Sequence, residues 1–208
     1  MTDAAMTDAA VTDAAVTDLV TGPDGRARCA WAGSALDYMA YHDDEWGRPV
    51  RDDDGLYERL TLEAFQSGLS WLTILRKRPA FRAAFKDFVI TEVARFDESD
   101  VARLLADPGI VRNRAKIEAA LHNARAAADL PAGLATLLWS YAPPPRAQRP
   151  RSFADVPAIT PESTAMAKEL KKRGFRFVGP TTAYALMQAT GMVDDHLADC
   201  HVACGQPR

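Results

Sequence analysis

The chain has few cysteines and no long hydrophobic run. Only three Cys occur in 208 residues, and in a reducing compartment so few favour metal ligands or free thiols over disulfides. No apolar run approaches the ~20 residues that a membrane span needs. The start also lacks the basic and apolar regions of a signal peptide. We therefore expect a cytoplasmic protein that does not contact a membrane.

Basic residues are missing from the first 25 positions, which carry five Asp and no Lys or Arg. This stretch begins with the repeat MTDAA-MTDAA-VTDAA-VTDLV, which has no aromatic residue and little to bury, so residues 1–25 are predicted to be a disordered acidic tail. Taking these five acids from the chain's 28 leaves 23 against 25 basic side chains, a balance of +2. The formal net charge of -3 therefore does not exclude a nucleic-acid partner.

Strand-like alternation over four or more residues is almost absent, so we expect an all-α fold. Residues 26–204 are predicted to form one domain, followed by a short tail at 205–208. The predicted helices cover residues 56–75, 79–85, 91–96, 99–105, 113–128, 160–173 and 181–190, with Ser99 as the cap of the fourth. The first helix is expected to break near Ser67-Gly68 and expose residues 66–69 as a turn. The four prolines of Ala142–Ser152 exclude regular structure there and predict a linker.

Cysteine and histidine cluster at two places far apart in the chain. Cys29 and His42 are separated by 12 residues, and His196 and Cys200 by three. Two thiolates and two imidazoles suit a tetrahedral, structural Zn2+ site without an open position. Scattered buried cysteines and surface histidines are the alternative, and His201 and Cys204 are rival ligands.

A basic stretch from Lys168 to Gly191 is predicted to form two helices joined by a hairpin between Gly174 and Gly179. Free backbone N–H groups at Gly179 and the dipole of the second helix favour binding of a DNA phosphate, and Lys171 and Lys172 add positive charge. A solvated basic helix face is the alternative interpretation.

A carboxylate stands among apolar residues at Glu63, eight positions before Trp71. Such a group accepts hydrogen bonds from the exocyclic amine of a purine while Tyr41, Trp46 or Trp71 stacks on the base. The alternative is that the aromatic residues belong to the core and Glu63 to the surface.

Five motifs, taken together and in order, resemble the DNA-3-methyladenine glycosylase I family of the helix-hairpin-helix superfamily. They are R-C-A-W, Y-H-D-D-E-W-G, L-E-A-F-Q-S-G-L-S-W, K-K-R-G-F-R-F-V-G and V-D-D-H, between Arg28 and about Cys200. The resemblance implies a monomeric bacterial enzyme at the nucleoid. It implies excision of 3-methyladenine from alkylated double-stranded DNA, with an abasic site left behind. No lysine stands out as a Schiff-base nucleophile, so we expect no strand cleavage. The resemblance also implies the helix-hairpin-helix glycosylase fold, with structural zinc at Cys29, His42, His196 and Cys200 joining the terminal segments.

The same resemblance implies roles for single residues. Glu63, as the catalytic carboxylate, and Tyr41 contact the edge of the extruded base, and Trp71 stacks on it. The other rings that shape the pocket are Trp31, Tyr38 and Trp46. The residues expected to contact DNA are Gln66, Gly68, Leu69, Lys171, Lys172, Gly174 and Gly179. We take Glu63 to be buried and ionised, so that it favours a cationic base.

Asp194 of V-D-D-H lies near a position where related superfamily members carry a catalytic acid. We consider a minor role in stabilising positive charge on the sugar, against the alternative of an acid that orients His196 or caps a helix. The acidic tail, the proline-rich segment Ala142–Ser152 and the extra Cys204 depart from the family pattern, and we expect none of them to touch the pocket. A non-catalytic zinc-containing DNA- or RNA-binding module and a zinc hydrolase with an open coordination position remain as alternative functions.

Overall fold

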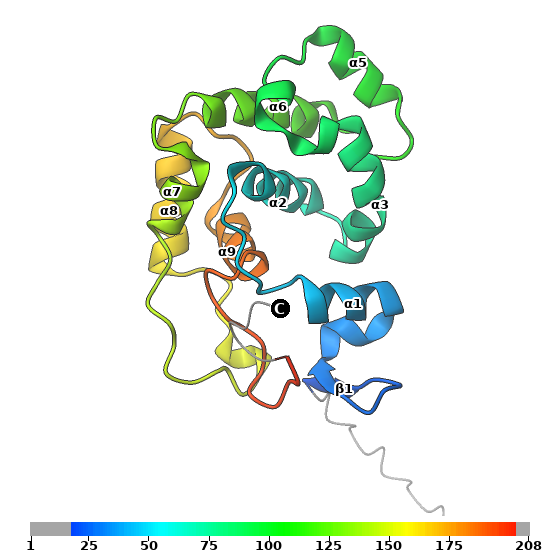
Figure 1. Ribbon diagram of the computed structural model, residues 1–208, viewed down its shortest axis with the longest axis vertical. Coiled ribbons are helices and arrows are strands. Elements are labelled where there is room, and N and C mark those ends of the chain that lie inside the picture. Colours follow the sequence, from blue (N-terminus) through cyan, green and yellow to red (C-terminus); the bar gives the residue numbers. More distant parts are fainter. Residues whose placement is uncertain (1–17, 203–208) are drawn as a thin grey trace, which may run out of the picture.

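The computed structural model describes residues 18–202, and Figure 1 shows them as a mainly helical array above a small N-terminal sheet. The α-helices are α1 (Leu36–Asp44), α2 (Asp53–Gln66), α3 (Trp71–Ala84), α4 (Ile90–Val93), α5 (Glu98–Ala106), α6 (Arg114–Ala128), α7 (Gly133–Trp139), α8 (Pro161–Lys172) and α9 (Pro180–Ala189). Three short 3-10 helices are η1 (Ala30–Ser34), η2 (Lys86–Phe88) and η3 (Phe153–Asp155). No helix in the described range is long and apolar enough to cross a membrane.

The helices begin where the sequence places polar capping residues. Asp52 accepts a hydrogen bond from Gly55 N at the start of α2, and Ser70 accepts one from Thr73 N at the start of α3. The predicted break between these two helices is confirmed, because α2 ends at Gln66 and Gly68 adopts a φ of +82°. The predicted cap of α5 was wrong by two residues, since Asp97 and not Ser99 holds that position.

Pro79 does not start a new helix, as the sequence had indicated, but lies inside α3. Proline removes one helical hydrogen bond and normally breaks the helix. Here Ile74 before it and Phe81 after it are both fully buried on the same core. Burial of these two side chains outweighs the local preference of the proline.

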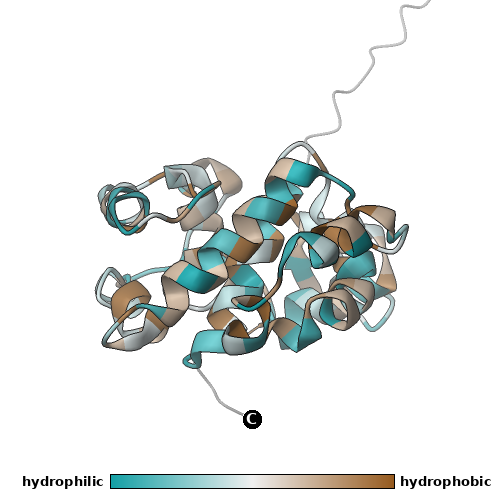
Figure 2. Cartoon of the chain, turned by 90° about the horizontal axis from the view of Figure 1, so that it is seen from above, coloured by the Kyte–Doolittle hydropathy of each residue, from teal (hydrophilic) through white to brown (hydrophobic). Residues whose placement is uncertain are grey.

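The core lies around α2 and α9, which contact each other, while α8 packs along α9. Apolar side chains of α2 such as Leu56, Leu60 and Phe65 are fully or almost fully buried. Figure 2 shows brown apolar and teal polar residues alternating along the helices, as in helices that bury one face. The central position of α2 is why Glu63, on the same helix, is also buried.

Residues 18–25 were wrongly assigned to the tail. Strand β1 (Leu19–Thr21) pairs antiparallel with β2 (Ala27–Cys29). Arg28 is only 4% exposed and forms ion pairs with Asp24 in the turn and Asp43 on α1, both at 2.7 Å. These long-range contacts order a stretch whose composition is that of a tail. The rest of the predicted tail (1–17), Cys204 and residues 205–208 lie outside the described residues.

The proline-rich segment Ala142–Ser152 has no helix or strand, as predicted. It is nevertheless tied to the C-terminal segment. Arg146 donates a hydrogen bond to Asp195 at 2.5 Å, and Arg149 donates one to Asp194 at 3.0 Å. These contacts make the segment part of the folded unit and more than a linker.

The loop between α8 and α9 is held by α6. The Asn123 side chain, 2% exposed, donates to Arg176 O at 3.0 Å and accepts from Arg176 N at 2.8 Å. Gly174 has a φ of +91°, and Phe177 in the same loop has a φ of +56° and is 47% exposed. A non-glycine residue in that region is uncommon and is kept there by its surroundings.

Candidate active site and metal centre

An aromatic cavity of about 260 Å³ opens between α1, α2, α3 and α9. All the predicted pocket residues line it, together with one residue predicted to contact DNA. They are Trp31, Tyr38, Tyr41, Trp46, Glu63, Trp71 and Gln66. The structure thus brings together residues from η1, α1, α2 and α3.

The rings form a continuous wall because α1 presents Tyr38 and Tyr41 one helical turn apart. The Tyr41 ring lies 5.4 Å from that of Trp71, and the Trp31 ring lies 4.9 Å from Tyr38 and 5.1 Å from Trp46. Trp71 Nε1 is buried without a hydrogen-bond partner. A flat ligand that stacks on these rings is the ligand that such a cavity suits.

Glu63 is the buried acid of the cavity, 7% exposed. No described residue donates a hydrogen bond to its carboxylate, and loss of solvent raises the pKa of Glu63 to about 8, with Arg59 opposing the rise. In the ligand-free protein the uncharged acid is therefore favoured at neutral pH, which differs from the expected ionised form. A cation in the cavity would lower this pKa and restore the carboxylate.

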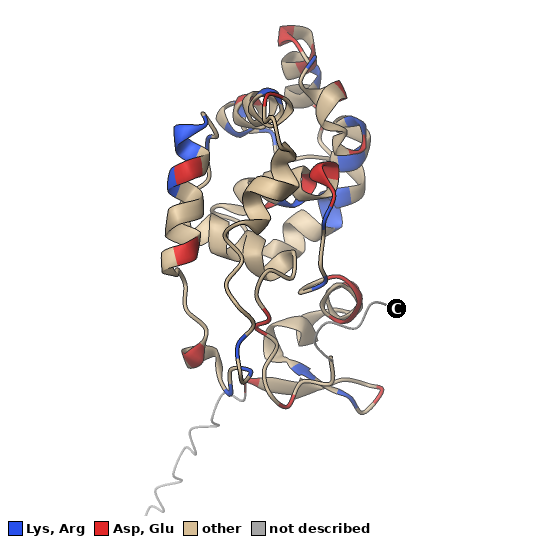
Figure 3. Cartoon of the chain, turned by 60° about the vertical axis from the view of Figure 1, so that its left-hand side comes forward, with Lys and Arg blue, Asp and Glu red and all other residues tan. Residues whose placement is uncertain are grey.

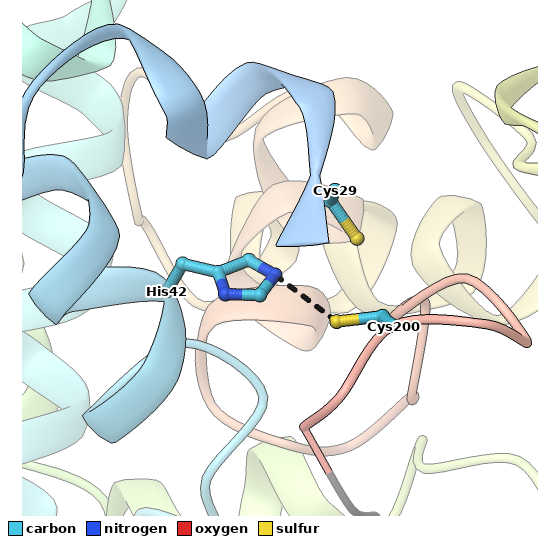
Figure 4. A group of neighbouring side chains, drawn as sticks. All are labelled: Cys29, His42 and Cys200. Atoms are coloured by element: carbon cyan, nitrogen blue, oxygen red, sulfur yellow. Dashed lines mark hydrogen bonds between the residues drawn. The ribbon is translucent and has the colours of Figure 1, made fainter. Parts of the chain in front are cut away.

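A second cluster lies beside the cavity, where α1, β2 and the C-terminal segment meet. The ligand atoms of Cys29, His42 and Cys200 lie within 4.8 Å of one another, and Figure 4 shows both sulfur atoms and an imidazole nitrogen converging. His42 Nε2 lies 3.5 Å from Cys200 Sγ. The hydrogen bond between Cys29 and Cys200 lowers the pKa of Cys200, and the hydrogen bond with His42 lowers it further. The bond with Cys200, together with burial, raises the pKa of Cys29.

His196, the fourth predicted ligand, lies beside this cluster, although its ligand atoms are not within 4.8 Å of all the other three. Its ring lies 4.9 Å from that of His42, and its Nε2 is buried without a hydrogen-bond partner. In both histidines Nδ1 faces an aspartate, Asp43 at 2.8 Å and Asp194 at 2.9 Å. This arrangement leaves each Nε2 free to bind a metal ion, as is usual for metal-ligating histidines.

The rival ligand His201 joins a separate grouping with His42 and Asp43. Its Nε2 lies 3.1 Å from Asp43 Oδ1, on the acid that orients His42. His201 N also donates to Ala27 O at 2.8 Å, which ties the C-terminal segment to β2.

The two adjacent acids of V-D-D-H point to different places. Asp194 contacts His196 and Arg149, which fits the alternative of an orienting acid. Asp195 instead lines the cavity. No residue of Ala142–Ser152 lines the cavity, as expected, although Arg146 contacts the lining residue Asp195.

Several lining residues were missed in the sequence, namely Phe153, Val156, Ala185, Gln188 and Asp195. Most are apolar or single polar residues in otherwise ordinary contexts, and they come from η3, α9 and the segments beside them. Only the pair of acids in V-D-D-H carried a signal, and the spacing alone did not say which acid faces the cavity.

The residues predicted to contact DNA lie at two places. Gln66 lines the cavity, and Gly68 and Leu69 follow it in the turn before α3, where Leu69 is 42% exposed. Lys116 holds this turn by donating to Phe65 O at 2.9 Å and Ser67 O at 2.6 Å. The remaining predicted contacts, Lys171, Lys172, Gly174 and Gly179, lie at or beside the α8–α9 loop. Figure 3 shows the basic residues at that end of α8 in blue.

The helical fold and a base-sized aromatic cavity with a buried carboxylate define a protein of the DNA glycosylase class. The chain belongs to the methyladenine glycosylase family, whose model matches residues 31–203.

Relatives and solved structures of similar length agree with this assignment. DNA-3-methyladenine glycosylase 1 of Escherichia coli (strain K12) is 43% identical over 177 residues, which cover 83% of this chain and 95% of that protein. The DNA-3-methyladenine glycosylase of Haemophilus influenzae is 41% identical, with coverage of 83% and 96%. The structure of 3-methyladenine DNA glycosylase I from Staphylococcus aureus, solved to explain 3-methyladenine recognition, superposes with a TM-score of 0.81 at 35% identity, covering 86% of this chain and 98% of that one.

Proposed function

We propose that this chain is a base excision repair enzyme that hydrolyses the N-glycosidic bond of 3-methyladenine in alkylated DNA and leaves an abasic site. The observation that carries the proposal is the buried carboxylate of Glu63, without a hydrogen-bond partner among the described residues, in a cavity of stacked rings. Relatives at 41–43% identity are named DNA-3-methyladenine glycosylases, which supports the same substrate here.

Methylation at N3 makes the adenine a cationic leaving group, so the enzyme mainly selects and positions it. Glu63 attracts the positive base and accepts a hydrogen bond from its amine, while Tyr41 and Trp71 supply stacking and cation–π attraction. The C1′–N9 bond breaks and its electron pair stays with the base, which departs as neutral 3-methyladenine. Water adds to C1′ of the sugar and loses one proton to the solvent, which leaves a hydroxyl group on C1′.

Before this reaction the base must leave the duplex. The turn from Gln66 to Leu69 follows the lining residue Gln66, and its exposed Leu69 side chain enters the gap that the extruded base leaves. The loop between α8 and α9 acts as the hairpin of a helix-hairpin-helix unit, in which Gly179 and the start of α9 bind a phosphate. Lys171 and Lys172, both exposed, add attraction to the backbone.

The Cys/His cluster holds a structural Zn2+ in this proposal. The donor set of Cys29, His42, Cys200 and His196 suits zinc, and the buried, unpaired Nε2 of His196 supports it as the fourth ligand. The ion supplies a cross-link between β2, α1 and the C-terminal segment. Four protein ligands leave no position for a substrate, which disfavours a zinc hydrolase. We further propose a monomer that works at the bacterial nucleoid, since the curated relatives are bacterial DNA glycosylases.

The proposal is tested by the bases released from methylated duplex DNA, separated by chromatography. We expect the wild-type protein to release 3-methyladenine but not 7-methylguanine, and Glu63→Ala to lose this release. Glu118→Ala is the matched control, because Glu118 is an exposed acid on α6 that does not line the cavity. A zinc-loaded wild-type protein that binds DNA but releases no base would contradict the enzyme and favour the non-catalytic DNA-binding module.

A further inference from the structure

A buried hydrogen-bond network joins the proline-rich segment to the cavity. Asp195 is 2% exposed, and one of its oxygens accepts from Arg146 at 2.5 Å. The other oxygen accepts from Tyr184 Oη at 2.7 Å and from Gln188 Nε2 at 2.8 Å. Arg146 also donates to Tyr184 Oη at 3.0 Å. The carboxylate is thus held from three directions.

The network lies in a wall between two cavities. Asp195 and Gln188 line the aromatic cavity, whereas Arg146 and Tyr184 line a neighbouring one of about 400 Å³ beside the proline-rich segment. Arg146 therefore acts on the aromatic cavity only through Asp195. A substitution of Arg146 would therefore affect the aromatic cavity through the carboxylate of Asp195.

This network decides how the side chain of Gln188 is oriented. A carboxylate paired with a guanidinium only accepts hydrogen bonds, so the amide must turn its NH2 group toward Asp195. The carbonyl oxygen of Gln188 then faces away from Asp195. It has no hydrogen-bond partner among residues 18–202, although the side chain lines the cavity.

We propose that Gln188 is a specificity-determining residue whose carbonyl oxygen accepts a hydrogen bond from the exocyclic amine of the bound base. Arg146 and Asp195 are positioning residues that keep this oxygen directed into the cavity. The inference rests on the proposed function and names a second acceptor for the same base.

The chemistry of the base fits two acceptors. The exocyclic amine of adenine carries two N–H donors, and the cavity offers the carboxyl group of Glu63 and the carbonyl of Gln188. A base with a carbonyl oxygen at this position brings no donor and leaves the Gln188 oxygen unpaired. Loss of one such hydrogen bond costs about a factor of ten in affinity.

The test compares binding of free 3-methyladenine and free 3-methylhypoxanthine, which carries an oxygen in place of the amine. Their dissociation constants are measured from the fluorescence of the cavity tryptophans, with release of 3-methyladenine from methylated DNA measured in parallel. We expect Gln188→Leu to reduce the preference for 3-methyladenine about tenfold. If this variant does not fold, Gln188→Met, which keeps the length of the side chain, takes its place.

Two variants of Arg146 test its role as a positioning residue. Arg146→Leu is expected to reduce the same preference, and Arg146→Lys to restore most of it because it keeps a cation against Asp195. Arg151→Leu is the matched control, an exposed arginine of the same segment, and should leave the preference unchanged. A merely structural role for Arg146 would lower stability without changing the ratio of the two dissociation constants.

Two negative results are distinguishable. If wild-type protein releases 3-methyladenine and folded Gln188 variants keep the wild-type preference, the role of Gln188 is wrong while the enzyme stands. Unchanged preference in Arg146→Leu alone would remove the positioning role. If wild-type protein neither releases nor binds 3-methyladenine, both the proposed function and this inference fail.

Discussion

The aromatic cavity and the Cys/His cluster meet on α1, where Tyr41 lines the cavity and the next residue, His42, joins the cluster. The two sites differ in how their titratable side chains are supported. In the cluster, Asp43 and Asp194 orient the histidines. In the cavity, neither the Glu63 carboxylate nor Trp71 Nε1 has a described partner.

Under the proposed function, the cluster would hold its ion permanently and the cavity would hold its base only during turnover. An unpaired buried polar group is destabilising. A ligand with matching groups that enters the cavity therefore pairs these groups and stabilises the protein. In the cluster, an aspartate contacts Nδ1 of each histidine, an arrangement that suits the proposed bound ion. Substitutions in the cluster should therefore act on stability, and substitutions in the cavity on activity.

The largest effect is expected from the cluster. Cys200→Ser should lose zinc and lower the stability by several kcal/mol, because the binding energy of a structural zinc ion is folding energy. Metal content and thermal unfolding measure this, and removal of metal with a chelator should act in the same way. Cys204→Ser should keep both zinc and stability. A Cys200→Ser protein with wild-type Tm would remove the distinction between the two sites.

Glu63→Gln is expected to lower activity without lowering stability. Release of 3-methyladenine should fall by about 100-fold or more, the range found when an electrostatic contact to a developing charge is removed. The Tm should not fall, because the amide has the same shape and carries no charge to bury. Single-turnover base release and thermal unfolding on the same preparation check both halves. A variant with normal release would show that Glu63 does not act on the base.

An intermediate effect is expected at the turn beside the cavity. Lys116→Met removes the donor to Phe65 O and Ser67 O and should lower the free energy of unfolding by about 1–3 kcal/mol. The turn that carries Leu69 loses its anchor, so excision from duplex DNA should suffer more than binding of the free base. Equal loss in both assays would mean that Lys116 supports the cavity itself and not the turn.

The last effect is a pH dependence of stability. Burial raises the pKa of Glu63 from 4.5 to about 8, so between these values the folded state holds a proton that the unfolded state has lost. Stability from this group is therefore present at low pH and falls as the pH rises toward 8. We expect Glu63→Gln to gain stability relative to wild type over this range, by at most a few kcal/mol. A difference in Tm that does not change between pH 5 and pH 8 would contradict the raised pKa.

Local sequence signals predicted much of the fold. The break at Ser67-Gly68 between α2 and α3 came from a polar cap and a glycine, which act within a few residues. The prediction that a new helix starts at Pro79 was wrong because it used only the local preference of proline. Burial of Ile74 and Phe81 in the core keeps α3 continuous there. The hairpin of β1 and β2 was missed because its order depends on the ion pair of Arg28 with Asp43 on α1.

The sequence by itself determined the helical pattern, the family and which aromatic residues and acid line the cavity, because these follow from residue types and motifs in order. Only the tertiary structure decided which of two adjacent acids faces the cavity. Asp195 does so because Arg146, 49 residues earlier in the chain, binds it, whereas Asp194 turns to His196. Contacts between residues so far apart depend on how the helices pack, and no local pattern in the chain records them.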